Sequence, residues 1–93
     1  MEIKQVSGQN RGDIFLYALS TCVWCKKTKA FLQQLGLAYR YVDVDLVPAG
    51  EKEAVMEQVA RWNAARNFPT IVVNDRTAIV GFQPERLKEV LGL

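Results

Sequence analysis

The chain has no histidine among its 93 residues. This absence excludes imidazole as a catalytic acid–base group and as a metal ligand. Cysteine is scarce as well: two residues are too few for the disulfide framework of a small secreted domain. No apolar run is long enough to cross a membrane, and the opening stretch MEIKQVSGQNRGD lacks the apolar segment of a secretory signal. We therefore expect a cytoplasmic protein without a membrane partner, in which a disulfide is more often transient than structural.

A strong charge of either sign is also missing. Twelve basic and ten acidic residues give a net charge of +2, and no basic stripe is interleaved with aromatic residues. Nucleic acid is therefore not an expected partner. With 49% hydrophobic residues the chain can build its own core. We expect a monomer with a single domain over residues 1–93, in which residues 1–12 form a lead-in segment.

Hydrophobic patterning after that segment predicts an alternation of strands and helices. The expected elements are a strand at 14–19, a helix at 23–35, a strand at 39–45, a helix at 51–65, strands at 68–73 and 77–82, and a helix from Pro84 onward. The first two strands flank a helix and should run parallel with a right-handed crossover. The last two form a hairpin with Asn74 and Asp75 as its turn. The fold class is thus α/β, ordered β-α-β-α-β-β-α, with a four-stranded mixed sheet flanked by helices.

The first predicted helix has an apolar stripe and a marked end. Gly36 is a suitable C-terminal cap. The stripe combines residues at i, i+4 spacing with two neighbours, and we expect it to face the core: Val23, Lys27 through its aliphatic stem, Phe31 and Leu35, with Thr28 and Leu32 beside them.

Both cysteines lie in STCVWCKKTKAFL, where the first strand gives way to this helix. At that place the sulfur of Cys22 meets unpaired backbone N–H groups and the positive end of the helix dipole. Lys26 and Lys27 add positive charge, and all these features stabilise a thiolate over a thiol. Cys25 lies one turn further along and deeper. We therefore predict Cys22 as the nucleophile and Cys25 as the thiol that resolves a mixed disulfide.

Other interpretations of the two cysteines remain. A structural disulfide would close a very small loop, which gives little stabilisation. A zinc site would need two more ligands than the cysteines supply. An iron–sulfur cluster shared between two chains would need external thiols. The redox interpretation is favoured, because CxxC beside a strand–helix–strand pattern is typical of thioredoxin-like proteins.

Three further features allow more than one interpretation. Trp24 is either an exposed contact for a substrate or a cover over the motif. Pro69 marks either a plain strand start or a cis-proline loop packed beside the cysteines. Asp43 and Asp45 alternate on one strand and should share a face, where we expect them to be solvated rather than catalytic.

CVWC after a strand, FPT opening the third strand and VGF before the last helix resemble the glutaredoxins of the thioredoxin-like superfamily. The resemblance extends over residues 14–91 and implies a thiol–disulfide oxidoreductase with Cys22 as nucleophile and Cys25 as second cysteine. It implies disulfide-bearing protein substrates, a reductase or glutathione as electron donor, and no bound cofactor. Trp24 stands where glutaredoxins often have tyrosine, which makes it a substrate contact.

The same resemblance implies further substrate-binding residues. Phe68 and Pro69 match the residue and cis-proline whose backbone pairs with an extended substrate. Arg66 matches a position that often holds a glutathione carboxylate. Gly81 and Phe82 match the turn that receives the γ-glutamyl end of glutathione.

Some positions depart from the glutathione-using members. Leu19 stands where they usually carry lysine, Val80-Gly81 replaces paired glycines, and Gln83-Pro84 replaces an acidic residue. Each lost charge-assisted bond is worth about 1.5–3 kcal/mol. These departures are more similar to the glutaredoxin-like hydrogen donors of ribonucleotide reductase, which thioredoxin reductase reduces. The alternative functions are a glutathione-ligated [2Fe–2S] cluster carrier and a thiol-bearing interaction domain without turnover.

Overall fold

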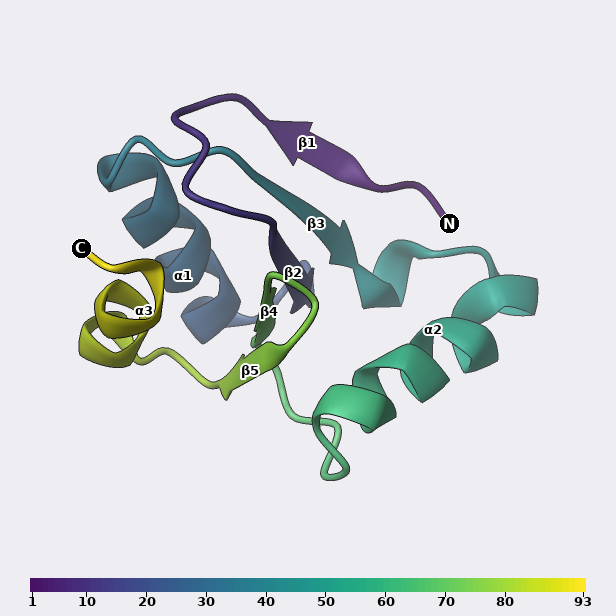
Figure 1. The fold of residues 1–93 in the computed structure, drawn as a ribbon. Coiled ribbons are helices and arrows are strands. Elements are labelled where there is room, and N and C mark those ends of the chain that lie inside the picture. Colours follow the sequence, from purple (N-terminus) through teal and green to yellow (C-terminus); the bar gives the residue numbers. More distant parts are fainter.

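In a computed structural model that covers all 93 residues, the protein forms a five-stranded sheet with helices on both faces. The sheet has the order β1-β3-β2-β4-β5. Helices α1 and α3 cover one face and α2 covers the other (Figure 1). No helix combines the length and apolar character needed to cross a membrane. The elements are β1 (Lys4–Val6), β2 (Ile14–Ala18), α1 (Val23–Gln34), β3 (Tyr39–Asp43), the 3₁₀ helix η1 (Val44–Leu46), α2 (Ala49–Trp62), β4 (Thr70–Val73), β5 (Thr77–Val80) and α3 (Pro84–Leu91).

The predicted fold class is confirmed with one change, the number of strands. The additional strand, β1, lies in the segment at 1–12 that was predicted to be a lead-in. It pairs antiparallel with β3, with Lys4 opposite Tyr41 and Val6 opposite Tyr39. Three residues are too few to show the alternation that marks a strand in the sequence. The start of the chain is thus an edge of the sheet.

The two predicted strand pairs are confirmed, and a pairing of β2 with β4 that the sequence did not predict joins them. β2 and β3 run parallel, with Ala18 opposite Asp43, and α1 forms the crossover between them. β4 is antiparallel to both β2 and β5. Asn74 and Asp75 form the hairpin turn with positive φ at both residues. The turn connection has one residue more than predicted, because Val73 pairs with Thr77.

Several predicted boundaries are wrong, most clearly those of one helix and one strand. The second helix begins at Ala49, directly after Pro48, and ends at Trp62, whereas the sequence predicted residues 51–65. The second strand ends at Asp43, and the chain then turns into η1 instead of continuing to residue 45. Element ends depend on caps and tertiary contacts more than on periodicity, which explains both differences.

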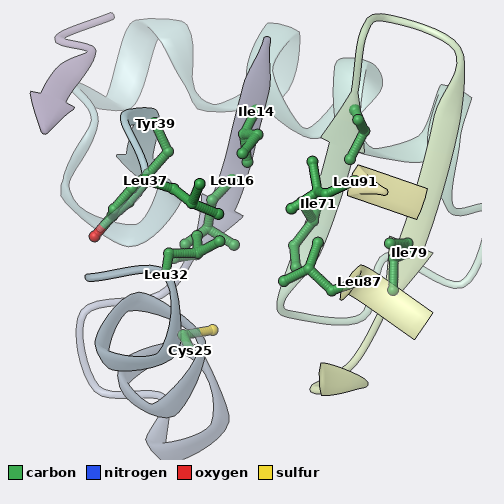
Figure 2. Packing of buried hydrophobic residues seen from close by; sticks show 12 residues of the cluster. Ile14, Leu16, Cys25, Leu32, Leu37, Tyr39, Ile71, Ile79, Leu87 and Leu91 are labelled. Atoms are coloured by element: carbon green, nitrogen blue, oxygen red, sulfur yellow. The ribbon is translucent and has the colours of Figure 1, made fainter. Parts of the chain in front are cut away.

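The core consists of one hydrophobic cluster on each face of the sheet. Between the sheet and the helices α1 and α3 is a cluster of twelve buried residues, including Leu16, Ile71 and Leu87 (Figure 2). Under α2 lies a smaller cluster in which six of seven residues are valines: Val42, Val44, Val47, Val55, Val59 and Val72, with Tyr17. Because both faces are covered, β2 has no solvated face, as its continuous apolar sequence predicted.

The face by which α1 meets the sheet differs from the predicted stripe. Its buried residues are Cys25, Thr28 and Leu32, at i, i+3 and i+7, whereas Val23 is 62% exposed and Lys27 is also exposed. Two neighbours that the sequence placed beside the stripe therefore form its centre. This rotation buries one cysteine of the motif and directs the residues between the cysteines outward.

We expect Leu32→Ala to lower the free energy of unfolding by about 2–5 kcal/mol, because it leaves a cavity between α1 and the sheet. Gln34→Ala is the matched control on the exposed side of the same helix, with an expected change within about 0.5 kcal/mol. Urea unfolding followed by tryptophan fluorescence measures both. Equal losses in the two variants would contradict this description of the core.

Candidate active site

Cys22 is the N-terminal cap of α1. Its backbone is extended, with φ −83° and ψ 118°, and its Sγ accepts a hydrogen bond from the backbone N–H of Cys25 at 3.2 Å. The sulfur thus takes the place usually held by an oxygen of serine, threonine or aspartate. The side chain is half-buried, so an incoming sulfur can reach it. The predicted location at the junction of a strand and a helix is confirmed.

Cys25 has no exposed surface and belongs to the core under α1. Figure 2 shows its side chain among the apolar residues of that cluster. Burial, followed by the hydrogen bond with Cys22, raises the pKa of Cys25 to about 12. This cysteine is therefore a protonated thiol at neutral pH, and both cysteines are free. The pair is chemically unequal, as the sequence predicted from the greater depth of Cys25.

Trp24 projects outward between the two cysteines and is 54% exposed. Its ring stacks on Phe82 with centroids 6.1 Å apart, and Phe82 contacts Phe31 edge-on at 5.9 Å. The ammonium nitrogen of Lys27 lies 4.6 Å from the centre of the Trp24 ring, within the range of a cation–π interaction. Of the two interpretations of Trp24, the exposed one agrees with this geometry.

Pro69 follows a cis peptide bond from Phe68 and is buried. Its carbonyl oxygen accepts the N–H of Gly81 at 2.8 Å, which ties this loop to the turn after β5. Gly81 has φ 83°, a conformation that favours glycine. A surface hollow of about 240 Å³ is lined by Trp24, Phe68, Gly81 and Phe82. Four of the predicted substrate-binding residues, from three separate parts of the chain, thus surround one hollow.

The predicted basic residues lie outside the lining of this hollow. Arg66 is exposed in the loop before Phe68, with φ 57°. Lys26 is exposed on α1. The roles of Arg66 toward glutathione and of Lys26 and Lys27 in stabilising a thiolate stay predictions.

A buried polar network that the sequence did not reveal holds the loop before Pro69. The Asn63 side-chain amide donates to the carbonyl oxygen of Asn67 at 2.9 Å and to Thr70 Oγ1 at 3.2 Å. The Thr70 hydroxyl donates to the same carbonyl at 2.7 Å. Isolated polar residues around a loop give no signal in the sequence until the fold places them together. The network fixes both ends of the segment that presents Phe68 and Pro69.

The two aspartates do not share a face of one strand, and that prediction is wrong. Asp43 ends β3 and pairs with Lys29 at 2.9 Å. Asp45 lies in η1, where it accepts hydrogen bonds from the Ser20 N–H at 2.8 Å and the Ser20 hydroxyl at 2.5 Å. These bonds hold the pKa of Asp45 below its usual value. The change from strand to 3₁₀ helix after Asp43 turns the second carboxylate toward the loop before Cys22.

Residues 14–78 match the glutaredoxin family. The chain belongs to this family. It is 47% identical to the glutaredoxin of Methanosarcina mazei Go1, with a TM-score of 0.90 over 98% of this chain and 88% of that one. It is 50% identical to methanoredoxin of Methanosarcina acetivorans, with a TM-score of 0.88 over 92% and 90%.

A more distant glutaredoxin-like structure is the NrdH-redoxin of Escherichia coli, 27% identical with a TM-score of 0.66 over 84% of this chain and 93% of that one. The predicted leaning toward hydrogen donors of ribonucleotide reductase stays a prediction. The curated relatives differ widely in length. This chain spans 14% of prostaglandin E synthase 2 of Danio rerio and 67% of a probable glutaredoxin of Synechocystis.

Alkylation should distinguish the two thiols. In a Cys22→Ser variant, iodoacetamide should label Cys25 slowly at pH 7.5 and faster only as the pH rises toward about 12, because burial, the main cause of the raised pKa, remains. In a Cys25→Ser variant, Cys22 should be labelled readily at pH 7.5. Mass spectrometry of timed samples measures both rates, with circular dichroism as the control for folding. Equal rates at pH 7.5 would contradict the assigned asymmetry.

Proposed function

We propose that the protein is a dithiol–disulfide oxidoreductase that reduces disulfides of proteins and mixed disulfides. The observation that carries this proposal is the unequal pair: a half-exposed sulfur capping a helix, one turn from a buried thiol with a raised pKa. An accessible sulfur among N–H donors suits attack on a disulfide. A buried neighbour within reach suits release of the product.

The reaction has two steps in this proposal. The Cys22 thiolate attacks one sulfur of the substrate disulfide, forming a mixed disulfide and releasing the other sulfur as a thiolate. Cys25 then attacks Cys22 Sγ, giving its proton to the departing thiolate as the substrate leaves reduced. Two electrons pass to the substrate, and the Cys22–Cys25 disulfide remains. An external reductant restores the dithiol.

The hollow beside Trp24 suits an extended substrate segment. The Pro69 carbonyl oxygen accepts a hydrogen bond from the N–H of Gly81. Phe68, in contrast, takes part in no backbone hydrogen bond of the loops. The backbone N–H and C=O of Phe68 therefore remain for a substrate strand, which supports the role that the resemblance implied. Trp24 and Phe82 add an apolar surface beside it.

The reductant proposed for this site is a protein reductase of the thioredoxin reductase type. Gln83, which replaces an acidic residue of glutathione-using members, donates its side-chain amide to the carbonyl oxygen of Val80 at 2.7 Å. The Gln83 side chain is therefore hydrogen-bonded within its own turn, and this position has no carboxylate to bind the ammonium group of glutathione. Leu19 likewise supplies no cation.

Replacement of Cys22 by serine should abolish reduction of a protein disulfide such as that of insulin, because the attacking sulfur is lost. Cys25→Ser is the matched control: it should keep attack by Cys22 and accumulate a mixed disulfide, visible as an added mass that dithiothreitol removes. Turnover by the Cys22 variant at the rate of the wild type would contradict the proposal.

The electron donor can be identified by measuring turnover of the wild-type protein with three reducing systems: glutathione with its reductase, thioredoxin reductase with NADPH, and a ferredoxin-linked reductase. We expect the thioredoxin reductase system to support turnover at least about tenfold better than glutathione, as loss of one charge-assisted bond would predict. Faster turnover with glutathione would contradict this choice of reductant and leave the dithiol chemistry in place.

The [2Fe–2S] alternative would use Cys22 as a ligand. No group of three or more Cys, Asp and Glu side chains is placed to hold a metal within one chain, so a cluster would need further ligands from glutathione and a second chain. A visible spectrum and iron content after anaerobic purification distinguish this alternative from the dithiol enzyme.

A further inference from the structure

The contact between Ser20 and Asp45 extends the pairing of β2 and β3 beyond the ends of both strands. The last paired residues are Ala18 and Asp43. Two positions further along each chain segment, the Asp45 carboxylate receives both the N–H and the hydroxyl of Ser20. Ser20 and Asp45 are 25 residues apart, the same offset as Ala18 and Asp43. A side chain thus continues the parallel register where the backbone ladder stops.

Ser20 belongs to the turn that delivers Cys22 to the helix. The turn begins at Leu19, whose carbonyl oxygen accepts the N–H of Cys22 at 3.2 Å. Ser20 is the second residue of this turn, and its N–H has left the sheet. By accepting both Ser20 donors, the Asp45 carboxylate links this turn to η1.

The contact between Ser20 and the Asp45 carboxylate is present at neutral pH. The hydrogen bonds from Ser20 lower the pKa of Asp45, so the ionised carboxylate is the form that the fold favours. A group with a lowered pKa contributes its stabilisation above its unfolded pKa and loses it as the pH falls through its folded pKa. The contact therefore weakens only in acid, below the range in which thiol–disulfide exchange operates.

We propose that Asp45 is a positioning residue for Cys22. It acts through Ser20 and holds the turn so that Cys22 Sγ stays at the N-terminus of α1, within reach of the Cys25 N–H. This inference rests on the proposed role of Cys22 as the nucleophile. It assigns a part of that function to a residue outside CVWC and outside the substrate hollow.

The experiment compares alkylation of Cys22 by iodoacetamide at pH 7 in a Cys25→Ser background. Asp45→Ala should lower the rate constant about tenfold, since small displacements of a reacting atom cost up to about a hundredfold in rate. Asp45→Asn, which keeps one acceptor oxygen, should restore part of the rate. Ser20→Ala loses one of the two bonds and should show a smaller loss. The control is Asp43→Asn, which removes the carboxylate at the end of β3 that pairs with Lys29 and not with Ser20, and it should stay within about twofold.

Two further measurements separate positioning from general stability. The NMR signal of the Cys25 amide should move in Asp45→Ala, because its bond to Cys22 Sγ is disturbed, and stay in place in Asp43→Asn. Alkylation of Cys22 in the double variant Ser20→Ala, Asp45→Ala should be no slower than in Asp45→Ala alone, because both substitutions remove the same contact.

The proposal is overturned if Asp45→Ala unfolds at lower urea concentration but keeps the Cys22 alkylation rate and the Cys25 amide signal. It is also overturned if the Ser20 and Asp45 effects add. If Asp45→Ala does not fold, the same comparison is made with Ser20→Ala and Asp45→Asn. Alkylation requires no disulfide turnover, so its result is independent of whether the protein reduces disulfides.

Discussion

The parallel pairing of β2 with β3 is the constraint on which the rest of the structure depends. Two parallel neighbours require a crossover, and α1 supplies it. The crossover starts at the end of β2, so the first turn of α1 lies at the carboxyl edge of the sheet, where its N–H groups have no carbonyl partner within the helix. Cys22 is the residue at that turn. The same edge holds η1, which follows β3, and the two segments meet through Ser20 and Asp45.

The second constraint is the covering of both faces of the sheet. Because α1 packs on it through Cys25, Thr28 and Leu32, one cysteine is removed from water while Trp24 remains outside. Burial is the main cause of the raised pKa of Cys25. The chemical difference between two identical side chains, three residues apart, is therefore a result of helix rotation rather than of residue type.

Much of this was accessible from the sequence because the signals were local. The continuous apolar run at 14–19 predicted a strand with two covered faces, and CVWC at its end predicted that Cys22 lies at the start of a helix. The cis bond before Pro69 was one of two stated alternatives. What the sequence could not show were contacts that form only in the folded chain: β1 against β3, Ser20 with Asp45, and Asn63 with Thr70. The first two depend on strand register, which is set only when strands pair, and the third depends on the path of the loop between α2 and β4. The rotation of α1 was missed because Val23 and Phe31 form an apolar row as plausible as the one that packs.

In the proposed mechanism Cys25 is a reacting group, and it is also one of the twelve residues of the larger core cluster. Under that mechanism the reduced and oxidised forms would differ inside the core, and the difference in their folding free energies would be thermodynamically linked to the reduction potential. For a two-electron couple, about 1.4 kcal/mol corresponds to about 30 mV. Apolar residues of the same cluster, such as Leu87 and Ile71, would thus be among the determinants of the potential. In evolution, packing substitutions at these positions would tune the driving force of the reaction while leaving the CVWC motif unchanged.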